Sequence, residues 1–204
     1  MPQAPAPLAR FLGDLEALVA AAPTESALLA AGGDLLGALV AKDDWLPDAY
    51  AELDPSHYRQ FLLYRDPPDG DRPSRFSVVS FVWGPGHASP VHDHTVWGLI
   101  GVLRGAEISQ RYTLATNGAP VPVGEPDRLE AGAIEAVSPR VGDIHRVSNA
   151  YADRASISIH VYGADIGKVR RSIYRPDGER RLFISGYSNT DACPPFTLNM
   201  EDPA

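Results

Sequence analysis

The sequence is poor in cysteine, in basic residues and in long apolar runs. Cys193 is the only cysteine among 204 residues, so no intrachain disulfide can form and a reducing, cytoplasmic location is expected. Lys and Arg number 18 against 26 Asp and Glu, which gives a formal net charge of −8. Because nucleic acids and anionic membranes bind basic surfaces, neither is an expected partner. No apolar run reaches the roughly 18 residues that span a bilayer, and the N-terminus does not resemble a signal peptide.

What remains is the composition of an ordinary globular protein, with 44% hydrophobic and 22% charged residues. The length fits one domain. We expect a single domain over residues 1–204, with helices in 1–50, a β-barrel core in 57–175 and a C-terminal arm in 176–204. The arm is expected to be loosely held after Tyr187. Composition leaves the oligomeric state open.

Residues 7–42 have the spacing of amphipathic helices. Apolar side chains recur at helical intervals from Leu8 to Val19. Pro23-Thr24 ends this helix, and Thr24 can cap a second one. We expect the second helix to be interrupted near Gly32-Gly33.

From about residue 57, short segments rich in Val, Ile, Tyr and Phe alternate with turns rich in Gly, Pro and Asp. This alternation predicts an antiparallel sandwich or barrel. The expected strands are Tyr58–Tyr64, Phe76–Trp83, Trp97–Leu103, Glu107–Leu114, Ala133–Val137, Ile144–Ser148, Ala155–Tyr162 and Ser172–Tyr174. Asn117-Gly118 predicts a tight hairpin turn, and residues 67–73 predict a surface loop.

Three histidines form a candidate metal site. His92 and His94 are separated by one residue, so on a strand their side chains lie on the same side. His145 follows a turn at Gly142 and supplies a third imidazole, a ligand that suits Fe, Zn, Cu or Ni. Three protein ligands leave coordination positions open to a substrate, which is typical of a catalytic site.

A second constellation is Ser158-Ile-His160-Val-Tyr162. The alternation of a strand places Ser158, His160 and Tyr162 on one face. Their hydroxyl, imidazole and phenol groups can form a hydrogen-bonded row that orients the phenol as a proton donor.

The histidine segments resemble the two motifs of the cupin proteins. The matching residues are Gly86-x5-His92-x-His94-x3-Gly98-x6-Gly105 and Gly142-x2-His145-x3-Asn149. The common cupin pattern has a glutamate ligand at the position of Gly98. A three-histidine set without that glutamate resembles the thiol dioxygenases, which include cysteine dioxygenase and 3-mercaptopropionate dioxygenase.

Other segments extend the resemblance to the thiol dioxygenases. The Ser158-His160-Tyr162 row matches the triad of that family, and residues 76–86 and 96–107 are similar to its bacterial branch. The animal enzymes have a cysteine near the position of Gly98 that is cross-linked to the active-site tyrosine. The glycine here implies that Tyr162 stays a free phenol.

The resemblance implies an all-β cupin fold, a double-stranded β-helix or jelly-roll barrel, behind the N-terminal helices. It implies one Fe(II) per chain, held by His92, His94 and His145. It also implies a dioxygenase that adds both atoms of O2 to the sulfur of a small thiol and yields a sulfinate. The expected partners are therefore a small-molecule thiol and O2.

The residues that bind the thiol's carboxylate are less sharply indicated. Typical cysteine dioxygenases use an arginine before the metal-binding segment, whereas the mercaptopropionate type has a glutamine there. The segment at 57–66 resembles the glutamine type, with Gln60 as the match and Arg65 as the competitor. Arg171, next to Arg170, is the third candidate. We expect 3-mercaptopropionate as substrate, with L-cysteine as the alternative.

Two other classes of protein remain possible from the sequence. One is a different metal-dependent cupin enzyme, such as a Zn or Mn hydrolase or isomerase. The other is a non-catalytic cupin that binds a small ligand. The glycine at position 98 and the Ser158-His160-Tyr162 row speak against the first, and an open three-histidine site speaks against the second.

Overall fold

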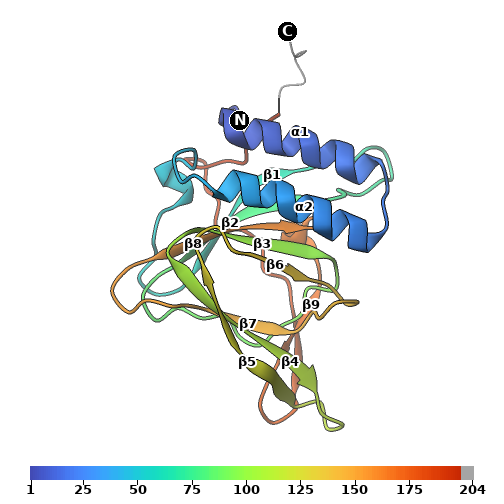
Figure 1. The fold of residues 1–204 in the computed structure, drawn as a ribbon, viewed down its shortest axis with the longest axis vertical. Coiled ribbons are helices and arrows are strands. Elements are labelled where there is room, and N and C mark those ends of the chain that lie inside the picture. The colour runs from blue at the N-terminus through green and yellow to red at the C-terminus, as the bar shows by residue number, and fades with distance from the viewer. Residues whose placement is uncertain (199–204) are drawn as a thin grey trace.

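The computed structural model describes residues 1–198, and two helices pack against a β-barrel (Figure 1). The helices are α1 (Ala6–Ala20) and α2 (Glu25–Val40). α1 buries the apolar face that its spacing predicts, including Leu8, Leu12 and Leu15. The Thr24 side chain accepts a hydrogen bond from the backbone N–H of Ala27 and so caps α2.

The predicted interruption near Gly32-Gly33 is wrong, because α2 is continuous through both glycines. Gly32 serves a packing purpose. A Cβ atom there would lie 2.8 Å from Cδ1 of Leu99, so the absence of a side chain lets the helix approach the barrel closely. Glycine costs helix stability in isolation, but tertiary packing determines the outcome here.

Within residues 1–198, the barrel is built from ten antiparallel strands arranged in three sheets. Their bounds are β1 (Arg59–Arg65), β2 (Ser77–Trp83), β3 (Gly98–Arg104), β4 (Ala106–Leu114), β5 (Pro120–Glu130), β6 (Ile134–Val137), β7 (His145–Asn149), β8 (Ser156–Tyr162), β9 (Arg171–Tyr174) and β10 (Arg180–Phe183). The sheet orders are β1-β2-β8-β3-β6, β5-β4-β7 and β10-β9. The expected all-β cupin barrel with an N-terminal helical annex is thereby confirmed.

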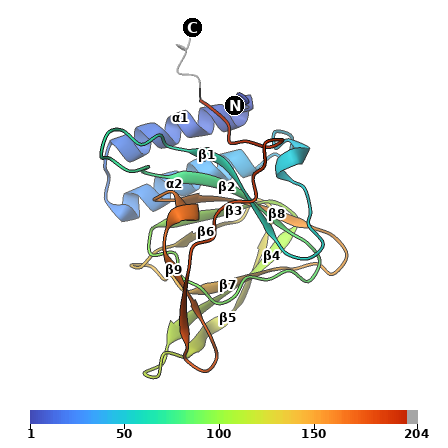
Figure 2. The ribbon, with the colours of Figure 1, turned by 180° about the vertical axis from the view of Figure 1, so that it is seen from behind.

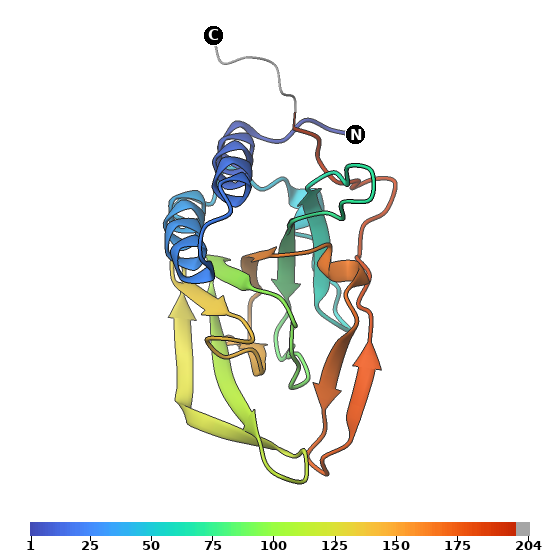
Figure 3. The same ribbon diagram turned by 90° about the vertical axis from the view of Figure 1, so that its right-hand side faces the viewer.

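The three sheets enclose the interior of the barrel. β2 and β8 lie in the middle of the five-stranded sheet and are buried along their whole length. The β4–β5 and β9–β10 hairpins meet at one end of the barrel, near Gly118 and Gly178 (Figure 3). The β4–β5 turn contains Asn117-Gly118, as the sequence predicts.

β5 and β10 were not predicted. β5 contains three prolines and one glycine and is exposed almost throughout, so its sequence has neither the alternation nor the composition of a buried strand. Its backbone nevertheless pairs with β4. β10 is also a sheet edge, with three of its four residues exposed. Backbone pairing alone defines these two strands, and a side-chain pattern cannot predict that.

The C-terminal segment is packed against β1 rather than loosely held (Figure 2). The backbone N–H of Ser188 donates to the carbonyl of Gln60 at 2.8 Å. The Asn189 side chain forms two hydrogen bonds with the backbone of Leu62, and the Phe196 side chain is buried. The expectation of a loose arm is therefore wrong for residues 188–198, whereas residues 199–204 lie outside the described part.

None of the helices in residues 1–198 has the length and apolar character needed to cross a membrane.

Candidate metal centre and substrate pocket

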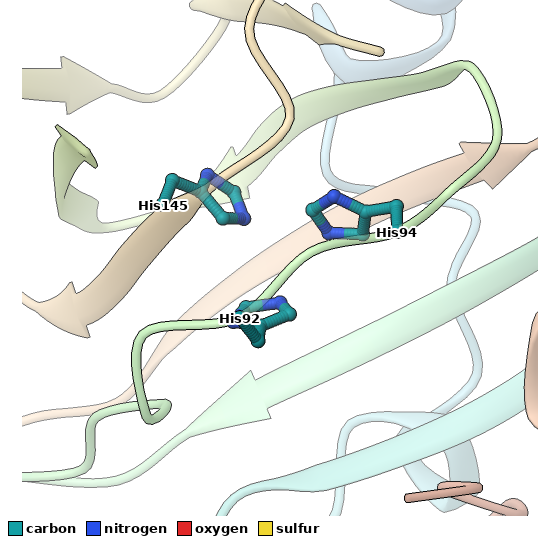
Figure 4. A group of neighbouring side chains, drawn as sticks. All are labelled: His92, His94 and His145. Carbon is teal, nitrogen blue, oxygen red and sulfur yellow. The ribbon is translucent and has the colours of Figure 1, made fainter. Parts of the chain in front are cut away.

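The structure brings His92, His94 and His145 together in the barrel (Figure 4). One potential ligand atom of each ring lies within 4.8 Å of the others. His145 begins β7, as expected for a histidine after the turn at Gly142. His92 and His94 are not in a strand of a sheet, however. Their segment joins β2 to β3 and is held by a two-way backbone pairing of His92 with His145, at 3.0 and 3.1 Å.

The second nitrogen of two of these rings is held by an acceptor. Nδ1 of His92 lies 3.0 Å from the carbonyl of Pro90, and Nδ1 of His94 lies 3.0 Å from Asp143. A neutral ring that donates from Nδ1 has its Nε2 lone pair free for a metal. Nε2 of His94 is buried and has no hydrogen-bond partner.

Two of the three rings also favour the neutral form that a metal requires. Burial, followed by the neighbouring imidazoles, holds the pKa of His92 and of His94 well below the ordinary value. Nδ1 of His145 has no hydrogen-bond partner and lies 3.8 Å from the Glu135 carboxylate, which accepts a hydrogen bond from Ser109. Three imidazoles around one point fit a first-row transition metal and leave positions open for other ligands.

Asp143 contacts the three-histidine group, although the sequence does not predict this. Its carboxylate accepts hydrogen bonds from the His94 ring and from the backbone N–H groups of His94 and Thr95. The only available signal is its place two residues before His145, and the sequence gives no indication that it reaches back to His94.

Ser158, His160 and Tyr162 form a continuous row along β8. Oγ of Ser158 lies 2.8 Å from Nε2 of His160, and Nδ1 of His160 lies 2.8 Å from the Tyr162 hydroxyl group. Trp83 donates its indole N–H to Ser158 at 3.3 Å. The Tyr162 ring stacks on the His94 ring with centroids 5.3 Å apart. The row therefore ends beside the three histidines.

Burial keeps this row uncharged. It holds the pKa of His160 well below the ordinary value, and it raises the pKa of Tyr162 above that of a free phenol. His160 is thus a neutral imidazole with one N–H, and Tyr162 retains its proton. A neutral phenol next to a metal site can donate one hydrogen bond to a bound molecule.

A pocket opens beside the histidines. Tyr58, Gln60, Arg171, Phe183 and Ser185 line it together with His92, His145, His160 and Tyr162. Tyr58, Phe183 and Ser185 were not predicted, and the last two belong to the segment expected to be an arm. None of the residues that line this pocket in the described part of the chain is Asp or Glu.

Arg171 is the only cation that lines the pocket in residues 1–198. The residue is 4% exposed; its Nη2 donates to Ser185 at 2.7 Å, and its guanidinium group lies over the Phe183 ring. Its Nε has no hydrogen-bond partner, and burial lowers its pKa. A buried guanidinium group without a carboxylate partner is suited to bind an anion.

The structure separates the other two carboxylate-binding candidates. Gln60 lies in the pocket, where one N–H of its amide donates to the carbonyl of Gly186 at 2.6 Å. Arg65 does not line this pocket. Its guanidinium group pairs with Asp165 at 2.9 Å, and both residues line a separate pocket. Its position therefore counts against the alternative that Arg65 binds the substrate.

Gly98 has a structural explanation. A Cβ atom at this position would lie 2.9 Å from Cδ1 of Tyr162 and 3.0 Å from Cγ2 of Val137. The Tyr162 ring thus occupies the space that a glutamate or cysteine side chain would need. The described residues hold one cysteine, Cys193, which is buried near Thr190 and does not line the pocket.

Solved structures with similar folds include several cupin proteins. One is a Klebsiella pneumoniae protein with a double-stranded β-helix domain, at 18% identity and a TM-score of 0.42, with 66% of this chain and 91% of that chain covered. Another is a cupin superfamily protein from Desulfitobacterium hafniense, at 13% identity and a TM-score of 0.39, with 56% and 84% covered. An oxalate oxidase matches at 14% identity and a TM-score of 0.40. That match covers 54% of this chain, which spans about half (53%) of the oxidase.

The family comparison is more specific. The model of the family "Cysteine dioxygenase type I" matches residues 40–173, which is more than half of the chain. The matched region contains the three histidines, the Ser158-His160-Tyr162 row, Gln60 and Arg171. The chain belongs to the cysteine dioxygenase type I family.

Proposed function

We propose that this protein is an Fe(II)-dependent dioxygenase of 3-mercaptopropionate. The reaction consumes one thiol and one O2 and yields one sulfinate, R–SH + O2 → R–SO2⁻ + H⁺, so both oxygen atoms end on the sulfur. Family membership supports a thiol dioxygenase. The choice of thiol is argued from the pocket.

The observation that carries this choice is the charge of the pocket. Arg171 offers a buried positive charge for the carboxylate of the substrate, and no lining Asp or Glu in residues 1–198 offers a negative charge for an ammonium group. L-Cysteine would bring its ammonium group into a pocket in which Arg171 is the charged side chain among the described lining residues. No lining carboxylate would then compensate the cost of removing water from the ammonium group. 3-Mercaptopropionate has the same thiol and carboxylate without the amine.

The donor set of the three histidines fits iron. Imidazole suits several first-row metals, and the buried, unpartnered Nε2 of His94 calls for a ligand. Fe(II) held by His92, His94 and His145 would supply affinity for a thiolate and the redox chemistry with O2. One ion per chain is the stoichiometry that the three-histidine set found in residues 1–198 supports.

The chain's own residues bind and orient the reactants. Arg171 binds the carboxylate, and Gln60 has one remaining amide N–H to donate beside it. The Tyr162 hydroxyl group, oriented by His160, donates a hydrogen bond to the bound reactants. The aromatic walls formed by Tyr58, Phe81 and Trp83 exclude water and strengthen these polar interactions.

The test is O2 uptake by protein loaded anaerobically with Fe(II), with 3-mercaptopropionate and L-cysteine compared side by side. We expect a much higher kcat/KM for 3-mercaptopropionate and one sulfinate formed per O2 consumed. A preference for L-cysteine would overturn the substrate assignment but leave a thiol dioxygenase. If neither thiol supports uptake, or if Zn or Mn supports a different reaction, the dioxygenase proposal itself fails.

A further inference from the structure

The barrel contains a buried carboxyl group that the proposed reaction does not use. Glu107 lies on β4 and is 0% exposed, and neither of its carboxyl oxygens has a hydrogen-bond partner. Leaving such a group without a partner destabilises the fold, and the cost is larger when the group is charged. A residue of this kind in the barrel interior calls for an explanation.

Glu107 lies next to the inner end of the Ser158-His160-Tyr162 row. Gly105, just before β4, packs directly on Ser156, because a Cβ atom added at Gly105 would lie 3.1 Å from Cα of Ser156. The hydroxyl groups of Ser158 and Ser156 face the Glu107 carboxyl group and act on its pKa. Oγ of Ser156 is itself buried without a partner. These two hydroxyl groups are therefore the ones that Glu107 can bond, directly or through one water molecule.

The surroundings of Glu107 favour its neutral form. Burial is the main cause that raises its pKa to about 8, the Ser158 and Ser156 hydroxyls lower it, and the charge of Glu135 raises it. The titratable group that acts on it is Glu135 on β6. His160 follows Ser158 by two residues along β8, and burial keeps it uncharged through a lowered pKa. Its register partners on β5 and β7 are Leu129 and Asn149, which do not titrate.

The protonation of Glu107 determines the direction of the row. A neutral Glu107 can donate its proton to Oγ of Ser158, directly or through one water molecule, and Ser158 also accepts the indole N–H of Trp83. The Ser158 hydroxyl then donates to Nε2 of His160, and Nδ1–H of His160 donates to the Tyr162 oxygen. The Tyr162 proton is left free to point into the pocket.

An ionised Glu107 reverses the donor and acceptor of each hydrogen bond in the row. The carboxylate accepts the Ser158 proton, so Nε2 of His160 must donate to Ser158. Since a neutral imidazole has a single N–H, Nδ1 of His160 then accepts the proton of Tyr162. The phenol O–H turns inward and no longer donates to the substrate.

We propose that Glu107 is a positioning residue, a buried neutral acid that holds the hydrogen-bonded row in the direction that presents the Tyr162 proton to the pocket. This inference rests on the proposed function, because Tyr162 is the donor in that reaction.

The pH profile of kcat for the Fe(II)-loaded protein tests the inference. In the wild type, kcat is expected to fall about tenfold per pH unit above a pH near 8, as the carboxyl group ionises. Glu107→Gln keeps a donor that cannot ionise, so its kcat stays flat over this range. Glu107→Met fills a similar volume without a donor and gives a low kcat at every pH. Glu125→Gln, at an exposed position of β5, retains the wild-type profile. A Glu107→Gln profile with the wild-type alkaline fall overturns the inference.

A second measurement does not depend on turnover. Infrared difference spectra of the wild-type protein between pH 6 and pH 9 should show the loss of a protonated carboxyl band, and Glu107→Gln should lack that loss. Absence of the band in the wild type at pH 6 overturns the inference whatever the activity. If the band is present but no thiol is oxidised, the proposed function fails while the buried acid stands.

Discussion

Asp143 and His94 are joined by two hydrogen bonds to the same carboxylate oxygen. Oδ1 of Asp143 accepts from Nδ1 of the His94 ring at 3.0 Å and from the His94 backbone N–H at 3.0 Å, and Oδ2 accepts from the Thr95 N–H at 2.9 Å. Thr95 has a φ of 62°, which is unusual for a β-branched residue. One side chain thus fixes both the ring orientation of a metal-ligand candidate and the strained backbone that follows it.

Replacement of this carboxylate should weaken metal binding. In Asp143→Asn, one oxygen becomes an N–H donor, so the His94 ring or the backbone loses its acceptor. We expect the affinity for Fe(II) to fall by about 10- to 100-fold. Competition against a chromophoric chelator measures this change. Asp127→Asn, at an exposed position of β5, is the matched control and should bind the metal as the wild type does. Equal affinities for Asp143→Asn and wild type would contradict the role of Asp143.

Arg171 and Arg170 provide a matched pair for testing carboxylate binding. Arg171 is buried in the pocket, whereas its neighbour Arg170 is exposed. Arg171→Gln removes a charged hydrogen bond, which contributes roughly 1.5–3 kcal/mol. The KM for 3-mercaptopropionate should therefore rise about 10- to 100-fold, with a smaller effect on kcat. Arg170→Gln should leave both constants unchanged. Steady-state O2 uptake measures them, and an unchanged KM in Arg171→Gln would place the carboxylate elsewhere.

Gly98 and Tyr162 are in such close contact that any side chain at position 98 should move the ring. Gly98→Ala places a Cβ atom about 2.9 Å from the ring carbon Cδ1. Overpacking of this kind typically costs about 1–3 kcal/mol, and here it also displaces the phenol to which we assign the hydrogen-bond donor role. We expect a lower Tm and a lower kcat, with the iron content unchanged.

The control for Gly98→Ala is Gly13→Ala. Gly13 lies in α1, and a Cβ atom there meets nothing within 4 Å. This substitution should raise stability by up to about 1 kcal/mol, since alanine favours helix over glycine. If Gly98→Ala has the Tm and kcat of the wild type, the Tyr162 ring does not require the space.

The sequence predicts the parts of this fold whose side chains alternate between buried and exposed faces or carry specific chemistry. Eight strands and both helices follow from apolar spacing, and the grouping of three histidines follows from short motifs. β5 and β10 could not be predicted, because backbone pairing holds them while their side chains face solvent.

Long-range contacts set the second limit of prediction. Asp143 reaches across 49 residues to His94. The C-terminal segment places Phe183 and Ser185 in the pocket because it packs along β1, and no local pattern in that segment indicates this. Arg65 and Gln60 are both in β1, and the structure places only Gln60 among the pocket residues because Asp165 holds Arg65 elsewhere.

The hydroxyl group of Tyr162 should matter for turnover and not for metal binding. It lies at the end of the row, 2.8 Å from Nδ1 of His160, while the ring packs on His94. Tyr162→Phe keeps the ring and removes only the donor. Loss of one aimed hydrogen-bond donor in a dry site typically costs about 10²-fold or more in kcat, so we expect a fall of that order with the Fe(II) content retained. Tyr112→Phe, which removes a hydroxyl group outside the pocket, should leave kcat unchanged. Unaltered turnover in Tyr162→Phe would mean that the row on β8 stabilises the barrel and takes no part in the reaction.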